Sequence, residues 1–155
     1  MEKKQKNDLK REDFRKIIVA VDGSKWSKRA AMRAIDLARD TDSEIEAIYV
    51  VYEPNYINPG FNGIYPGAIE LIKEIMKEKV NSILDRVKKM GSKLGVHVKT
   101  KLVFGLPDKE IIKQSGKNDL IIMGCRGHSG RRNILIGNVC ERVMHHVRSH
   151  IMVIH

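Results

Sequence analysis

Short apolar runs and amphipathic stretches alternate along the chain from residue 16 onward. Near-continuous apolar runs at 16–21, 44–52 and 119–123 resemble strands that are buried on both faces of a parallel sheet. Residues 96–104 alternate apolar with polar side chains, which is the pattern of an edge strand, and 151–154 form a last short apolar run. The pattern therefore predicts five strands.

Between these runs, apolar residues recur every three or four positions, which predicts a helix in each gap. Ser24 is a good N-cap for the first helix, and Trp26 is expected to be its first core-facing residue. Gly91 is expected to weaken the last turn of the second helix and Gly95 to end it. The expected helices cover about 25–39, 68–94, a short segment between Pro107 and Gly116, and 139–147.

Strands that alternate with helices form a parallel sheet. We therefore predict a single α/β domain over 15–155, with a doubly wound, open, five-stranded parallel sheet of order 3-2-1-4-5 and a Rossmann-like architecture. Residues 1–14 are charged and aperiodic, and we interpret them as a mobile arm. In such sheets ligands bind beyond the carboxyl ends of the strands at the topological switch. Asp22 follows the first strand and Met123-Gly124 ends the fourth, so these two loops are expected to form a ligand site.

Composition narrows the classes of partner. The net charge of +10 favours an anionic partner. Aromatic residues make up only 5% of the chain and do not cluster among basic residues, so nucleic acid is not the expected ligand. No apolar run approaches the ~20 residues of a membrane span, and the first residues lack a secretory pattern. The two cysteines, Cys125 and Cys140, indicate a reducing compartment, and a cytoplasmic protein is expected.

The stretch 119–140 carries the strongest chemical signal. It passes from an apolar run through a glycine- and arginine-rich loop into a helix pattern, which exposes backbone N–H groups to a phosphate. Its glycines at 124, 127 and 137 follow G-x2-G-x9-G, which is neither the P-loop nor the dinucleotide-binding spacing. Gly124 and Gly127 are expected to allow close backbone approach and positive φ. Arg126 is placed to add charge, and Arg131 and Arg132 either add to it or lie in a solvated loop.

With this motif the chain resembles the universal stress protein family, and in particular its ATP-binding subgroup, in which Ser or Thr follows the last glycine. The resemblance covers the chain after about the first 15 residues. It implies an adenine-nucleotide ligand (ATP, ADP or AMP) in contact with Asp22, a candidate to hold a phosphate-bound Mg²⁺ or Mn²⁺. It also implies that Ala20 and Val50 lie near the adenine. The positions that it assigns to the ribose and phosphates are Met123, Gly124, Gly127, Gly137, Asn138, Val139 and Cys140.

The chain departs from the subgroup directly after the last glycine, where Asn138 replaces Ser or Thr. Asparagine supplies an amide donor, a good N-cap oxygen and more bulk than a hydroxyl residue. Cys140 stands where the subgroup commonly has a hydroxyl residue. Binding is expected to survive, because the principal donors are backbone N–H groups. The preference among ATP, ADP and AMP stays open.

Three classes of function follow from these residues. The first is a stress-response or signalling module in which bound nucleotide sets a conformation or a partner affinity, with slow or no hydrolysis, because no general base stands out. The second is a slow ATP hydrolase whose metal is held by Asp22. The third is a nucleotide-independent dimeric binding protein. A homodimer is expected, because the apolar run 151–154 would be a sheet edge without proline or lysine, and the resemblance implies the same arrangement.

Overall fold

The computed structural model of the chain describes residues 14–52, 66–127 and 135–155. Within these ranges five strands form one parallel sheet in the order β3-β2-β1-β4-β5, which confirms the predicted fold. The strands are β1 Lys16–Ala20, β2 Glu44–Tyr52, β3 Val98–Gly105, β4 Leu120–Gly124 and β5 His150–Ile154. The helices are α1 Lys25–Thr41, α2 Pro66–Lys93, α3 Pro107–Lys113 and α4 Asn138–His146. Residues 1–13 of the expected arm lie outside the described residues.

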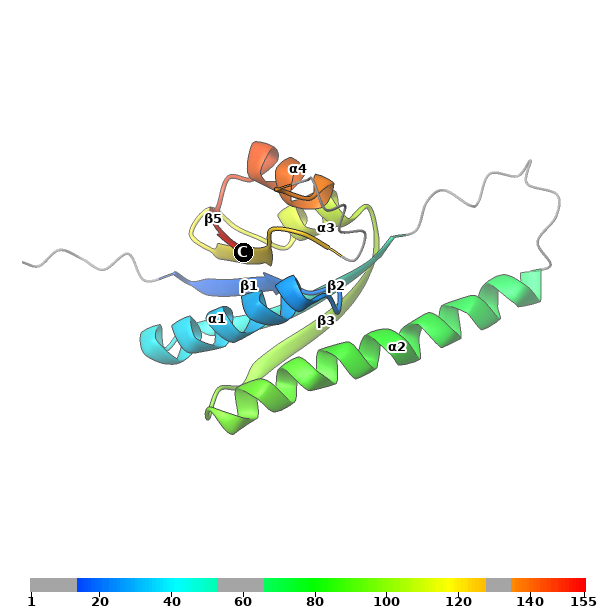
Figure 1. The fold of residues 1–155 in the computed structure, drawn as a ribbon, viewed down its shortest axis with the longest axis horizontal. Coiled ribbons are helices and arrows are strands. Elements are labelled where there is room, and N and C mark those ends of the chain that lie inside the picture. Colours follow the sequence, from blue (N-terminus) through cyan, green and yellow to red (C-terminus); the bar gives the residue numbers. More distant parts are fainter. Residues whose placement is uncertain (1–13, 53–65, 128–134) are drawn as a thin grey trace, which may run out of the picture.

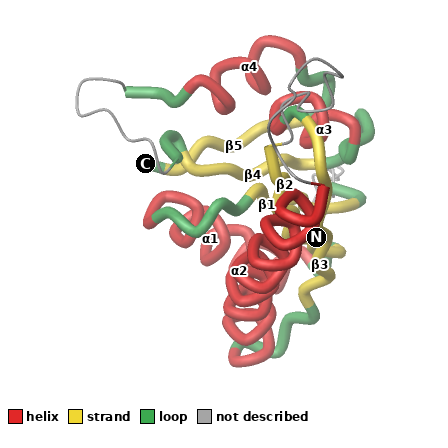
Figure 2. Tube along the Cα trace, turned by 90° about the vertical axis from the view of Figure 1, so that its right-hand side faces the viewer, coloured by secondary structure: helices red, strands yellow, loops and turns green. Residues whose placement is uncertain are grey.

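Helices cover both faces of the sheet: α1 and α2 lie on one face, and α3 and α4 lie on the other (Figure 1, Figure 2). The sequence of β1 explains this arrangement. Ile17 and Val19 pack into a cluster with residues of α1 and α2, whereas Ile18 packs on the opposite face with Ile111 and Val143. All three β1 residues are 0% exposed. Because successive side chains of a strand point to opposite faces, such a run requires a helical layer on each side.

The central strand β1 creates the switch point. It pairs in parallel with both neighbours, and Ala20 lies opposite Ile48 of β2 and Met123 of β4. From β1 the chain enters α1 on one face, whereas the helix that follows β4 lies on the other face (Figure 2). The connections therefore diverge at the carboxyl ends of β1 and β4, and this divergence leaves room for a ligand.

The first turn of α1 matches one expectation and corrects another. Ser24 is the N-cap as predicted, and its Oγ accepts a hydrogen bond from the Ser27 backbone N–H at 3.1 Å. Trp26 does not face the core: it is half-buried and belongs to neither hydrophobic cluster, whereas the neighbouring Ser27 is buried. The buried stripe of α1 is made mostly of alanines. Small side chains let α1 lie close to the sheet, which leaves no room for an indole beneath the helix.

The end of α2 shows a second correction. Gly95 has φ of +73° and ends the helix region as predicted. Gly91, expected to weaken the last turn, also has a packing role: a Cβ there would overlap the Val98 side chain and lie 2.7 Å from the Val96 carbonyl oxygen. The correction concerns the start of the next strand. The Val96 N–H donates to the Gly91 carbonyl at 2.9 Å, so these residues still belong to the turn, and β3 begins at Val98 rather than at 96. At its other end α2 extends past the sheet (Figure 1).

Candidate functional site

A crevice of about 760 Å³ opens at the carboxyl ends of β1 and β4, and its size is that of a small-molecule pocket. Its walls come from the ends of three strands, the loop after β4 and the first turn of α4. The residues predicted from the sequence all line it: Ala20, Asp22, Val50, Met123, Gly124, Arg126, Gly127, Gly137, Asn138, Val139 and Cys140. The structure thus brings the whole set together, whereas the contact of each residue with a nucleotide stays a prediction. Arg131 and Arg132 lie outside the described residues.

Two glycines let the loops around the crevice approach one another. A Cβ on Gly124 would lie 2.7 Å from the Cβ of Trp26 and 3.0 Å from the backbone N of Ser27. A Cβ on Gly127 would lie 2.8 Å from Oδ2 of Asp22. Real Cβ atoms do not approach other atoms this closely, so close approach explains both glycines. The expected positive φ is wrong, because among the described glycines φ is positive only at Gly23, Gly95 and Gly105.

The first turn of α4 presents its backbone donors to the crevice. Gly137 is the N-cap, with φ of −75° and ψ of 154°, and it makes no side-chain cap hydrogen bond. Residues 138–140 therefore occupy the first helical positions, whose N–H groups lack intrahelical acceptors. Asn138 is the first helical residue and is exposed, so its expected use as an N-cap oxygen is wrong. The arrangement favours an anion, because unpaired N–H groups meet the positive end of the helix dipole.

Asp22 lies between the two loops. Its Oδ1 accepts a hydrogen bond from the Ser24 backbone N–H at 2.9 Å, which fixes the turn that leads from β1 into α1. Its Oδ2 faces Gly127 across the crevice. Burial, and then the negative charge of Asp22, raise the pKa of Tyr49. One carboxylate oxygen thus has a structural partner within the turn, and the other points to the ligand space.

The inner wall of the crevice is apolar. Ile48 and Met123 are buried, Ala20 and Val50 are half-buried, and Ile111 from α3 closes the same wall. These side chains belong to the cluster between the sheet and the α3–α4 layer. A flat apolar ring fits such a wall, whereas the N–H groups of α4 and the loop suit a charged group. The crevice therefore has separate places for the two halves of an amphipathic ligand.

Cysteines contribute backbone rather than reactive thiols to the site. Cys125 and Cys140 are free, and they are 0% and 2% exposed. Burial, and then the proximity of Cys125, raise the pKa of the Cys140 thiol to about 11. The Cys140 Sγ lies 4.0 Å from the Met144 Sδ. The Cys125 backbone joins two elements, because its N–H donates to the Ile154 carbonyl at 2.8 Å and its carbonyl accepts from the Gly137 N–H at 2.7 Å.

Arg126 extends from the loop after β4 toward α1. Its guanidinium carbon lies 5.6 Å from the centre of the Trp26 ring. Its Nε is buried and has no hydrogen-bond partner among the described residues. A buried donor without an acceptor is costly, so an acceptor is expected beside this atom. Arg126 thus lines the crevice on the side of the glycine loop.

The sequence reasoning missed part of the crevice. Pro107 and Ile111 of α3 and Arg142 of α4 also line it, and Arg142 lies 3.9 Å from Asp108 of α3. These residues adjoin the site because α3 and α4 pack side by side over the sheet. The available signal was Pro107, which starts a short helix after an edge strand. It gave no indication that α3 lies next to the switch point.

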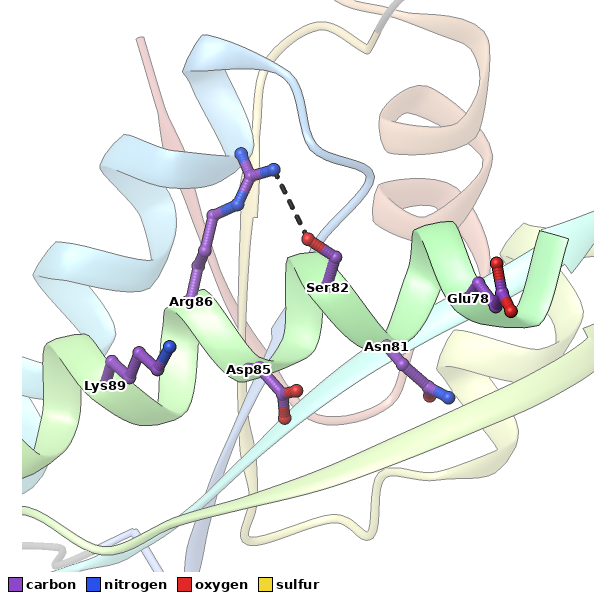
Figure 3. A pocket seen from close by; sticks show the side chains of 6 residues that line it. All are labelled: Glu78, Asn81, Ser82, Asp85, Arg86 and Lys89. Atoms are coloured by element: carbon purple, nitrogen blue, oxygen red, sulfur yellow. Dashed lines mark hydrogen bonds between the residues drawn. The ribbon is translucent and has the colours of Figure 1, made fainter. Parts of the chain in front are cut away.

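The described residues hold no metal cluster, and a second hollow lies away from the crevice. In residues 14–52, 66–127 and 135–155 no group of three His, Cys, Asp or Glu side chains converges. His145, His146, His150 and His155 are all exposed. A second hollow lies along α2 and is lined by six polar side chains of that one helix: Glu78, Asn81, Ser82, Asp85, Arg86 and Lys89 (Figure 3). Its one hydrogen bond joins Arg86 to Ser82 at 3.4 Å, and we interpret it as a solvated helix face.

Comparison with known proteins identifies the family of the chain. Residues 13–155 match the universal stress protein family. The chain is 38% identical over 143 residues to the universal stress protein MJ0531 of Methanocaldococcus jannaschii, covering 91% of this chain and 82% of that protein. It is 30% identical over 135 residues to the universal stress protein YxiE of Bacillus subtilis, covering 84% and 91%. The chain therefore belongs to the universal stress protein family.

Solved structures share the same architecture. Hypothetical protein MJ0577 superposes with a TM-score of 0.77 at 24% identity, covering 92% of this chain and 96% of that one. A universal stress protein in complex with cAMP gives a TM-score of 0.67 at 19% identity, with coverage of 92% and 98%. The Archaeoglobus fulgidus protein in complex with dAMP gives 0.60 at 20% identity, with coverage of 92% and 99%. At these identities the similarity establishes the fold. No helix in the described part of this chain is long and apolar enough to cross a membrane.

Proposed function

We propose that this universal stress protein binds an adenine nucleotide in the crevice at the switch point. The observation that carries the proposal is the convergence of the predicted residues from four chain segments on one crevice of about 760 Å³. Family members of the same fold in complex with cAMP and with dAMP support the choice of an adenine nucleotide. The proposal also places the protein in a reducing compartment such as the cytoplasm, because both cysteines are free thiols.

In this proposal, the apolar and the polar half of the crevice take the two halves of the ligand. The adenine ring packs on the apolar wall near Ala20 and Val50. The phosphates lie against Gly124, Gly127 and the start of α4, where N–H groups without intrahelical acceptors supply hydrogen bonds. Asn138 preserves this set, because its contribution there is a backbone N–H, and its exposed amide adds a further donor.

We further propose that the nucleotide acts as a conformational or partner switch and is hydrolysed slowly or not at all. Asp22 is the one carboxylate among the described residues of the crevice, and the Ser24 N–H already occupies one of its oxygens. A ligand in the crevice touches the turn before α1 and the start of α4, which belong to opposite layers. Its binding energy therefore depends on how the two layers sit relative to each other.

A divalent ion fits this site as a companion of the phosphates. Mg²⁺ prefers oxygen ligands and is usually held by one or two carboxylates together with phosphate oxygens. Asp22 Oδ2 faces the ligand space, so Asp22 would hold the ion, which would neutralise phosphate charge. The Asp22 carboxylate then orients the ion and the turn together, without a separate metal cluster.

The proposal includes a homodimer through β5. This strand is the last in the sheet, and its four apolar residues are half-buried. An apolar strand edge without a guarding charge is a template for pairing with another chain. Pairing of β5 with its counterpart in a second copy would cover this edge and place two crevices in one assembly.

Calorimetry with ATP, ADP and AMP, with and without Mg²⁺, tests nucleotide binding, and mass spectrometry of small molecules released from the purified protein tests it independently. We expect heat from at least one adenine nucleotide and a steady-state hydrolysis rate below ~1 s⁻¹. If turnover is faster and Asp22→Ala abolishes it, the hydrolase alternative replaces the switch. The absence of heat with every adenine nucleotide would contradict the proposed ligand.

A further inference from the structure

Three cations surround Trp26, the single tryptophan of the chain. The Lys25 Nζ lies 4.9 Å from the centre of the indole, the Arg29 guanidinium carbon 5.1 Å and the Arg126 guanidinium carbon 5.6 Å. All three distances are within the range of cation–π attraction. Lys25 and Arg29 belong to the start of α1, whereas Arg126 comes from the loop after β4. Cations from two segments far apart in the sequence thus lie around one indole. We call Lys25, Trp26, Arg29 and Arg126 the Trp26 cluster.

The Trp26 cluster lacks a counter-charge. In the described part of the chain none of its three cations forms an ion pair, although other cations do, such as Arg15 with Asp119 at 3.3 Å. The hydrogen bond recorded for Arg29 goes to the backbone carbonyl of His155 at 3.3 Å. Like charges held around one ring repel each other, and an anion placed among them relieves this repulsion.

Arg126 connects the Trp26 cluster to the crevice. It lines the crevice, and its Nε is buried without a hydrogen-bond partner. The indole is held beside it, because the Trp26 Cβ lies against Gly124, where a Cβ would be only 2.7 Å away. Arg126 thus belongs to both the lining of the crevice and the Trp26 cluster, and the cluster adjoins the crevice through this one residue.

We propose that the Trp26 cluster binds the distal phosphates of a linear polyphosphate, so that the crevice prefers adenine nucleotides with longer phosphate chains. This inference rests on the proposed function, because it assumes that the proximal phosphate lies at α4. Guanidinium groups form bidentate hydrogen bonds with phosphate, and an ammonium group acts as a point charge. Trp26 is a positioning residue, since its ring holds the cations through cation–π contacts. The monophosphate AMP does not extend to these cations, whereas a triphosphate does.

The test compares AMP, ADP and ATP by calorimetry at low salt and follows Trp26 fluorescence in the same titrations. We expect the affinity to rise from AMP to ATP and the fluorescence of the one indole to change most with ATP. Lys25→Ala and Arg29→Ala each lower the ATP-to-AMP affinity ratio by about two- to fivefold, which is the usual range for an exposed charge contact. Lys28→Ala is the matched control: Lys28 is exposed on the same turn, and its removal leaves this ratio at the wild-type value.

Inorganic tripolyphosphate separates this inference from the proposed function, because it lacks adenine. We expect it to change Trp26 fluorescence in the wild type and to lose most of this effect in Arg29→Ala. Equal affinities for AMP and ATP, or an equal drop of the ratio in Lys28→Ala, overturn the inference and leave adenine-nucleotide binding intact. If no adenine nucleotide binds, the proposed function fails. In that case a fluorescence response to tripolyphosphate that depends on Arg29 still supports the Trp26 cluster as an anion site. The lack of any response contradicts an anion site at the Trp26 cluster.

Discussion

The Oδ2 atom of Asp22 lies 2.8 Å from the place that a Cβ of Gly127 would occupy. This contact joins the turn after β1 to the loop after β4 at the mouth of the crevice. Because Asp22 is also tied to the Ser24 N–H at 2.9 Å, it has little freedom to move away from a larger residue. Gly127 therefore sets the width of the space in which the proposed phosphates lie.

Gly127→Val is expected to reduce adenine-nucleotide affinity by ~tenfold or more, because two added methyl groups and a Cβ enter the space between the loop and Asp22. Calorimetry with ATP measures the loss. Thermal unfolding serves as the control: the close contact with Asp22 is expected to lower the melting temperature, and a cooperative transition shows that the variant is still folded when its affinity is measured. Wild-type affinity in a folded Gly127→Val protein would contradict the proposed position of the phosphates.

Gly124→Ala is expected to destabilise the fold by ~1–3 kcal/mol, because its Cβ would overlap the Cβ and backbone of Trp26 on α1. Gly137→Ser provides the comparison within the same motif. Its Cβ would make only ordinary contacts, at 3.5 Å and beyond, and serine is a favoured N-cap. Urea unfolding should therefore show a loss for Gly124→Ala and no loss for Gly137→Ser. Similar stability of the two variants would mean that α1 shifts to accommodate the methyl group.

The Cys140 thiol predicts a loss of stability at alkaline pH. Its pKa is raised from 9.0 to about 11 in the folded chain, so the folded state keeps the proton over a range in which the unfolded state releases it. The free energy of unfolding therefore falls as pH rises from about 9 to about 11, by at most ~2–3 kcal/mol. Other groups titrate in this range, so the measurement is the difference between wild type and Cys140→Ala in urea unfolding at about pH 8 and about pH 10.5. A difference that does not change with pH would exclude this contribution.

Val153→Pro is expected to convert the proposed homodimer into monomers. The His150 N–H donates to Asp119 and the Ile154 carbonyl accepts from Cys125, so alternate residues of β5 direct their polar groups toward β4 and its adjoining loops. By the period of two, Val153 directs its N–H to the free edge, where proline removes a donor without breaking the β4–β5 ladder. Light scattering at micromolar concentration measures the change. Met152→Pro is the contrasting variant. The backbone N–H of Met152 faces β4, so its loss should destabilise the fold itself.

Sequence periodicity was sufficient to predict the architecture, because each strand has its own hydrophobic pattern. The buried run in β1 requires helices on both faces, and the alternating run at 96–104 marks an edge. The crevice followed from topology, since residues at the carboxyl ends of β1 and β4 must meet at the switch point. The same reasoning could not predict the orientation of Trp26. That orientation depends on how closely α1 approaches Gly124, and this distance is set by tertiary packing. Nor could it place Pro107 and Ile111, because the lean of α3 over the sheet has no local signature.

The backbone of Cys125 has one hydrogen bond to Ile154 at the end of β5, through its N–H, and another to Gly137 at the start of α4, through its carbonyl. The start of α4 and the end of β5 are thus linked through the two peptide groups on either side of the Cys125 Cα. If two copies pair through β5, nucleotide binding and dimerisation are coupled through this link. Nucleotide binding then changes the dimerisation constant by the same factor by which dimerisation changes the nucleotide affinity. The fraction of this protein that is dimeric would then follow the concentration of adenine nucleotide in the cell.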